Sequence, residues 1–258
     1  MEVGMSAVVE LSRAEIVTIC AVVSAASIMG VAPAQNPAEH AQLLQLGEAA
    51  LRQRQLAQSD QDGMLMIARD PLALVATCAY PQRSLIIHHV QHNGSVLQAF
   101  GHKHADSVVF HEVLNSDMQR LQAFGSLAQL ANYSLDWCGY AGSAELSVRW
   151  HIQSTVLAEA RSLVEQSEEQ AALRALGNSG VSAEAAIRLI ELLSQPHTTT
   201  IFNAVVYQGQ QVLSREYSLL QAGQHTLLMT QTNIEQDLYQ LETTSRERLA
   251  NLLIQSLA

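Results

Sequence analysis

The chain has 258 residues, of which 48% are hydrophobic, enough for one large core or two smaller ones. Its formal net charge is −10 and Lys103 is its only lysine, so it lacks the clustered positive charge that nucleic-acid binding needs. Its three cysteines are far apart and odd in number. We therefore expect a cytoplasmic protein with buried, reduced thiols and no disulfide framework.

An uncharged run covers residues 16–32 and ends in Ala32-Pro33-Ala34, which resembles a signal peptide with its cleavage site. Glutamates outnumber arginines before this run, so the positive start of a signal peptide is missing. Ser12 and Glu15 have the spacing of a capping box, which begins a helix. We interpret the run as a buried core helix from Ser12 to about Met29, with a signal peptide or membrane anchor as the alternative.

The rest of the first half reads as helices followed by strands. Pro37 begins a second helix, and Asp62-Gly63 predicts a turn that leads into a short extended wing. Asp70 is expected to cap a third helix with Pro71 at its first position. Asn93-Gly94 predicts a hairpin turn. The strands and the closing helix are expected at 85–90, 96–100, 108–113 and 117–132.

The second half repeats this order. A long helix, a short helix and a helix capped by Ser182 come first, and a hairpin around Gln208-Gly209, a third strand and a last helix capped by Asn233 follow. The expected ranges are 145–166, 168–176 and 182–193 for the helices, 198–207, 211–217 and 225–230 for the strands, and 233–257 for the last helix.

The two halves match at a shift of 115 positions, which places Pro81 on Pro196 and Gly94 on Gly209 with the apolar residues in phase. We predict an α+β protein of two tandem units related by a pseudo-two-fold axis. Each unit has helices, a three-stranded antiparallel sheet and a closing helix, and the two sheets join edge to edge. The expected units are 1–132 and 143–258, with a packed linker at 133–142. Two unrelated α+β segments are the alternative.

Six of the ten histidines lie between positions 88 and 111. With Asn93-Gly94 as a two-residue turn, His89 opposes Gln98, roughly 13 Å along the strand from His102, so the hairpin alone forms no three-histidine site. His102 and His104 could bind a metal only with a residue from elsewhere, such as His111 or Glu112. We therefore expect no stoichiometric zinc and no cofactor.

Catalytic motifs are also missing. The sequence has no nucleophile elbow, phosphate-binding loop, dinucleotide fingerprint or zinc-protease motif, so we expect no enzyme and assign no catalytic residues. We expect a protein–protein interaction module with a protein partner, no nucleic-acid partner and no membrane. One alternative is a winged-helix DNA-binding regulator, because Arg52 and Arg54 precede the predicted wing. A hydrolase or metal enzyme is a further alternative.

The first hairpin and the loop after it are the candidate partner-binding surface. Phe100, His102, Lys103 and His104 place the one lysine beside two histidines in a chain that is otherwise poor in positive charge. A positive patch on an acidic protein would steer an acidic partner segment towards it.

The order of elements resembles one family, the EspG proteins, which are cytosolic chaperones of mycobacterial type VII secretion. The resemblance lies in residues 50–56, in Asp62-Gly63-Met64-Leu65, in the helix that ends near Tyr80-Pro81, and in residues 173–177 and 192–196 of the second half. It covers nearly the whole chain as a pattern. It implies a non-catalytic protein that keeps helical PE–PPE-type secretion substrates soluble through its sheet and C-terminal helix surfaces. No recognition residue matches well enough to be carried over.

Overall fold

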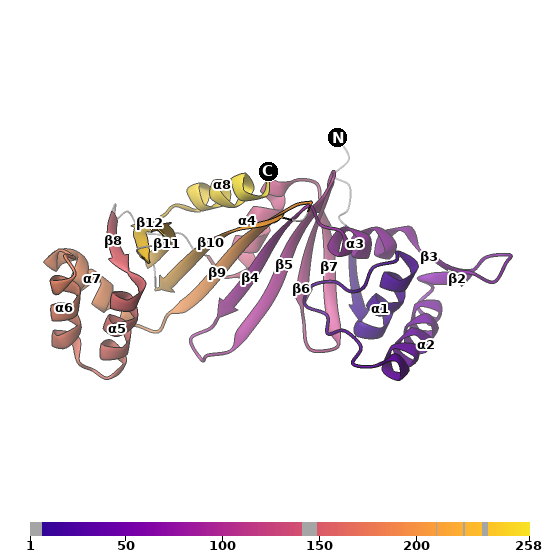
Figure 1. Ribbon diagram of the computed structural model, residues 1–258, viewed down its shortest axis with the longest axis horizontal. Helices are drawn as coiled ribbons and strands as arrows, with labels where there is room; N and C mark the ends of the chain where they lie inside the picture. The colour runs from indigo at the N-terminus through magenta and orange to yellow at the C-terminus, as the bar shows by residue number, and fades with distance from the viewer. Residues whose placement is uncertain (1–6, 141–148, 210, 224, 234–236) are drawn as a thin grey trace.

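The computed structural model describes residues 7–140, 149–209, 211–223, 225–233 and 237–258 (Figure 1). One ten-stranded antiparallel sheet runs through the molecule, in the order β1-β7-β6-β5-β4-β9-β10-β11-β12-β8. The α+β class predicted from the sequence is therefore confirmed. The described part of the chain contains no helix long and apolar enough to cross a bilayer.

The first half supplies one side of the sheet and a small separate hairpin. Its elements are β1 (Val8–Ser12), α1 (Arg13–Val22), α2 (Pro37–Gln53), β2 (Ala57–Ser59), β3 (Leu65–Ile67), α3 (Arg69–Ala79), β4 (Arg83–Val90), β5 (Val96–His104), β6 (Ser107–Val113), β7 (Met118–Phe124) and α4 (Leu127–Trp137). The short hairpin of β2 and β3 is the wing that the sequence predicted.

The second half supplies the other side. Its elements are β8 (Arg149–Gln153), α5 (Ser154–Glu165), α6 (Glu169–Asn178), α7 (Ala183–Leu193), β9 (Thr198–Gln208), β10 (Gln211–Ala222), β11 (His225–Asn233), β12 (Leu238–Thr243) and α8 (Arg246–Leu257). The halves meet where β4 pairs with β9, so the sheet is continuous, as expected, and its strand order is symmetric about this pair. An origin by duplication stays a prediction.

The helices cover the two faces of the sheet differently. Helices α4 and α8 pack on the middle of one face, over a core that includes Ile87, Phe110 and Phe202. Helices α1–α3 and α5–α7 form two groups at opposite ends of the sheet (Figure 1). Side chains alternate between the two faces of a sheet along each strand. Leu121 of β7 and Leu241 of β12 belong to the cores under these two groups, and the register puts both side chains on the face opposite to α4 and α8. Both groups of helices therefore cover that other face.

The expected three strands for each unit are wrong, because in the described part of the chain each half contributes five strands to the large sheet. The range 117–132, predicted as one helix, contains β7 and the start of α4. The range 145–166 holds β8 before α5 in its described part. In both ranges the spacing of the apolar residues is compatible with a helix and with a strand, because the segments are short. Pairing with a neighbouring strand is what makes them extended.

Several expected helix ends also differ. Helix α1 stops at Val22, after which Ser24 adopts a positive φ of 59°, so the helix does not reach Met29. Helix α3 begins at Arg69, so Asp70 is not its cap. The last helix begins after Ser245, whose hydroxyl accepts the Arg248 N–H.

The capping box of Ser12 and Glu15 is confirmed, and α1 is a buried core helix. The predicted linker at 133–142 is wrong over Tyr133–Trp137, which belong to α4. In the described remainder of the linker, Tyr140 is buried in the core and its hydroxyl donates to the Thr244 carbonyl oxygen. Residues 141 and 142 lie outside the described part of the chain, as does the predicted start of the second unit at 143.

Candidate functional site

The middle of the sheet presents a partly exposed surface between the two end groups of helices. Strand register puts the relevant side chains on one face, because Ile86 opposes Asn203, His88 opposes Ile201 and Asn203 opposes Glu216. These side chains are half-buried or exposed. We call this surface the open sheet face and define it by Ile86, His88, Val90, Ile201, Asn203 and Glu216.

The open sheet face mixes apolar and polar groups. Ile86, Val90 and Ile201 supply apolar area, and His88 hydrogen-bonds through Nε2 to the Gln98 side chain at 2.9 Å. The Asn203 Oδ1 atom is buried and has no hydrogen-bond partner among the described residues. A surface that is half apolar and half polar is suited to contact with another protein.

The predicted partner surface is only partly available. Phe100 is 2% exposed and His102 is fully buried, so the expectation that these two contact a partner is wrong. Both lie on the face of β5 that α3 covers. Lys103 is half-buried and His104 is exposed, with its Nδ1 atom 2.5 Å from the Tyr80 carbonyl oxygen. These two residues stay a proposed contact.

The register of the first hairpin explains this error. The sequence predicted that His89 opposes Gln98, whereas it opposes Leu97. The Gln91 N–H donates to the Ser95 carbonyl oxygen, so Asn93-Gly94 belongs to a longer loop than the expected two-residue turn. A slip of one residue moves side chains to the opposite face. His102 and His89 therefore lie on opposite faces.

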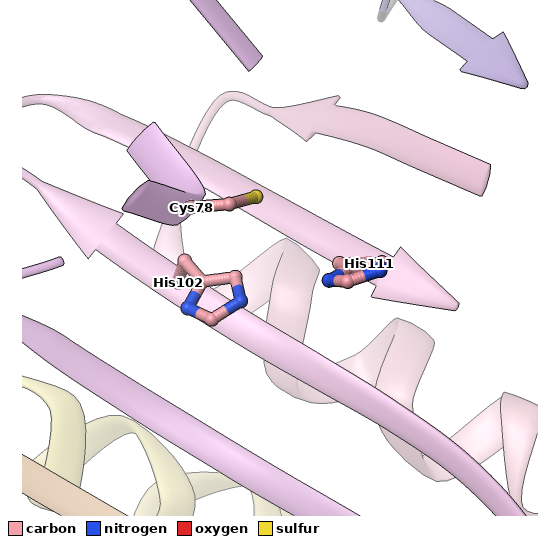
Figure 2. A group of neighbouring side chains, drawn as sticks. All are labelled: Cys78, His102 and His111. Atoms are coloured by element: carbon pink, nitrogen blue, oxygen red, sulfur yellow. The ribbon is translucent and has the colours of Figure 1, made fainter. Parts of the chain in front are cut away.

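The structure brings together a set of side chains that the sequence did not connect. Cys78 at the end of α3, His102 on β5 and His111 on β6 lie around one point (Figure 2), and one ligand atom of each lies within 4.8 Å of the other two. All three side chains are buried, between 0% and 2% exposed. We call this group the Cys78 cluster. The sequence-based hypothesis joined His102 to His104 and a further residue such as His111 or Glu112. The cluster contains His102 and His111, but Cys78 takes the place of His104, which is exposed.

Hydrogen bonds hold both histidine rings of the Cys78 cluster from outside. The His102 Nδ1 atom lies 3.1 Å from the Ser84 hydroxyl, and the His111 Nε2 atom lies 3.0 Å from the Gln119 Oε1 atom. The remaining ring nitrogens, His102 Nε2 and His111 Nδ1, have no hydrogen-bond partner among the described residues.

Burial keeps the Cys78 cluster uncharged. It lowers the pKa of His102 to about 3 and that of His111 to about 4, so both rings are neutral at physiological pH. Burial also raises the pKa of the Cys78 thiol far above its ordinary value, with a smaller contribution from Cys20.

The arginines that suggested DNA binding are engaged in ion pairs. Arg52 contacts Glu48 at 2.7 Å, and Arg54 contacts Glu15 at 2.8 Å. Their charge is therefore used within the protein, and the winged-helix alternative is not favoured.

Two kinds of candidate functional residue could not be recognised from the sequence. Ile86 and Ile201 look like ordinary strand residues, and only the position of the end helices leaves their face open. Cys78 lies far from the histidines in sequence, with no metal-binding spacing to reveal it. Cross-strand register is the signal that places His102 beside His111, because His111 pairs with Phe100, which lies two residues from His102 on the same face of β5.

The fold is that of an α+β protein with one long antiparallel sheet. No family model matches the sequence, and no curated protein matches it. Among solved structures, the chain is similar to one described as the Mycobacterium tuberculosis type VII secretion system chaperone EspG5 in complex with a PE25–PPE41 dimer. The likeness covers 97% of this chain and 95% of that chain, with a TM-score of 0.70 and 12% sequence identity. The chain has an EspG-like fold, as the resemblance predicted.

Proposed function

We propose that this protein is a non-enzymatic protein–protein interaction module that acts as a cytosolic chaperone or adaptor. Its partner would be a helical protein of the kind handled in type VII secretion. The observation that carries the proposal is the correspondence of fold over 97% of the chain with a chaperone that was solved in complex with a PE25–PPE41 dimer.

The open sheet face is the proposed contact surface. Ile86 and Ile201 lie on the two central strands, and the partner would bury their exposed area. The end helices flank this surface, so a helix laid across the middle of the sheet would contact both halves of the protein (Figure 1).

Lys103 and His104 form a second proposed contact at the turn between β5 and β6. Lys103 places positive charge on a chain of net charge −10, so this contact would attract an acidic segment of the partner. Such a contact mainly raises the association rate, and salt weakens it.

The test begins with affinity capture from the native host and continues with purified components. The captured protein is expressed alone and together with this chain. A chaperone predicts that the partner is soluble as a one-to-one complex and aggregates when expressed alone. A partner that stays soluble alone, or a purified pair that forms no complex, would contradict the proposal.

A further inference from the structure

The Cys78 cluster has the chemical composition of a metal site. One thiol and two imidazoles are the ligand types that suit Zn²⁺ and Cu⁺. They come from three elements, α3, β5 and β6, and their ligand atoms lie within 4.8 Å of one another. Tetrahedral or trigonal bonds of about 2.0–2.3 Å would put these atoms roughly 3.4–3.8 Å apart, so side-chain shifts of about 1 Å would close the site.

The two histidines already have the arrangement of ligands. A metal-binding histidine usually bonds through its other ring nitrogen to an outer group, which fixes the tautomer and the ring orientation. Ser84 and Gln119 supply such bonds. The Gln119 Nε2 atom points to the Asn115 carbonyl oxygen, so its Oε1 atom accepts the His111 Nε2–H and leaves a lone pair on Nδ1.

The unused nitrogens make the cluster costly as a purely structural feature. His102 Nε2 and His111 Nδ1 are buried without a partner among the described residues. A buried polar atom that has lost its water and gained no partner destabilises the fold. Coordination of a cation would satisfy both nitrogens at once.

Strand pairing identifies the counterpart of His102 in the second half. Ser84 opposes His102 in the β4–β5 pair. At the shift of 115 positions Ser84 corresponds to Thr199, which opposes Leu220 in the β9–β10 pair. Leu220 belongs to the apolar core under α5–α7. The fold therefore accepts a leucine where the first half has a buried histidine.

The same comparison applies to the other two ligands. The next strand of each half is compared through its pairing: His102 opposes Val109 of β6, and Leu220 opposes Leu227 of β11. Two residues further along these strands, His111 corresponds to Met229. At the shift of 115, Cys78 of α3 corresponds to Leu193 of α7. Leu193 is buried in the same apolar core, and Met229 packs against it. Leu193, Leu220 and Met229 therefore occupy in the second half the positions of Cys78, His102 and His111. The fold itself does not require a thiol and two imidazoles at these positions.

We propose that Cys78, His102 and His111 bind one thiophilic d¹⁰ cation, Zn²⁺ or Cu⁺. Binding forms one metal–sulfur and two metal–nitrogen bonds, and the Cys78 thiol proton leaves to solvent. Because the ligands are buried, a substrate does not reach the cation, and its role is to tie the end of α3 to β5 and β6. This proposal reverses the sequence-based expectation of no zinc.

The test uses the full chain without a histidine tag. Its metal content is measured by elemental analysis as purified, and after titration with Zn²⁺ or, anaerobically, with Cu⁺. We expect about one equivalent of one of these cations, and the two titrations show which is preferred. Co²⁺ serves as a probe, because coordination by the Cys78 thiolate gives a sulfur-to-cobalt charge-transfer band.

Matched variants separate binding from folding. Cys78→Ala should lose the cobalt band, whereas Cys138→Ala, which alters a buried thiol in the core under α4 and α8, should keep it. The double variant His102→Leu, His111→Met copies the second half, so it should fold and bind no cation. The proposal is overturned if the folded wild-type chain binds less than about a tenth of an equivalent of all three cations, or if Cys78→Ala keeps the band.

Discussion

Ile87 of β4 and Phe202 of β9 lie directly opposite each other at the centre of the ten-stranded sheet, and both are fully buried. They are also separated by 115 positions, the shift that superposes the two proline–glycine pairs. The pair therefore marks the centre of the symmetric strand order. Because both side chains belong to the core under α4 and α8, the two halves share one hydrophobic core at this point.

Two neighbouring arginines should differ strongly in their contribution to stability. Arg54 contacts both carboxylate oxygens of Glu15, which is 2% exposed, at 2.8 and 2.9 Å. Arg54→Met would leave that carboxylate buried without its cation and should cost about 2–3 kcal/mol. Arg52→Met removes an exposed pair with Glu48 and should cost about 0.5 kcal/mol or less. Urea unfolding of both variants checks this, and equal costs would contradict it.

Two helical glycines predict opposite effects of the same substitution. A Cβ atom on Gly47 of α2 would overlap the Ala14 carbonyl oxygen and the Thr18 hydroxyl of α1, so Gly47→Ala should force the two helices apart. The expected loss is about 2 kcal/mol or more, despite the better helix propensity of alanine. A Cβ atom on Gly177 of α6 meets no atom, so Gly177→Ala should stabilise by up to about 1 kcal/mol. Thermal unfolding of both variants gives the signs. A stabilising Gly47→Ala would contradict the helix contact.

His89 should make the fold sensitive to acid. Burial lowers its pKa, and its Nδ1 atom lies 2.8 Å from the Thr200 hydroxyl. Well above pH 6.5, the ordinary pKa of histidine, the ring is neutral in both folded and unfolded chains, so it contributes no pH dependence there. Below that value the unfolded chain takes up a proton more readily, and stability falls by at most about 1.4 kcal/mol per pH unit.

The variant His89→Asn isolates this effect, because its amide can still bond to Thr200 but does not titrate. The difference in unfolding free energy between wild type and variant should move in favour of the variant as the pH falls from 7 to 5. A difference that stays constant over this range would show that the His89 pKa is not lowered.

Local signals predicted much of the fold. The capping pair of Ser12 and Glu15 begins α1 as expected, because a helix cap depends on neighbouring residues alone. Ser182 caps α7 for the same reason. Strand β7 was missed because Leu121 and Phe124 have helical spacing, and only pairing with β6 makes the segment extended.

The candidate sites were harder to predict. The open sheet face depends on where the end helices stop, which is a tertiary property. The Cys78 cluster depends on the hairpin register, which Gln91 and Ser95 set through a backbone hydrogen bond inside the loop. A turn motif gives the position of a hairpin more reliably than its register, and the register decides which face His102 occupies.

The most direct test of the proposed function compares two isoleucine variants in binding to the purified partner. Ile201→Arg puts a charge at the centre of the open sheet face, and Ile187→Arg puts the same charge on α7 at a side chain that is 48% exposed. Calorimetry should show a loss of at least about tenfold in affinity for Ile201→Arg, because a desolvated charge costs more than 1.4 kcal/mol at an interface. Ile187→Arg should bind like wild type. If Ile201→Arg keeps full affinity while circular dichroism shows it folded, the partner does not bind the open sheet face.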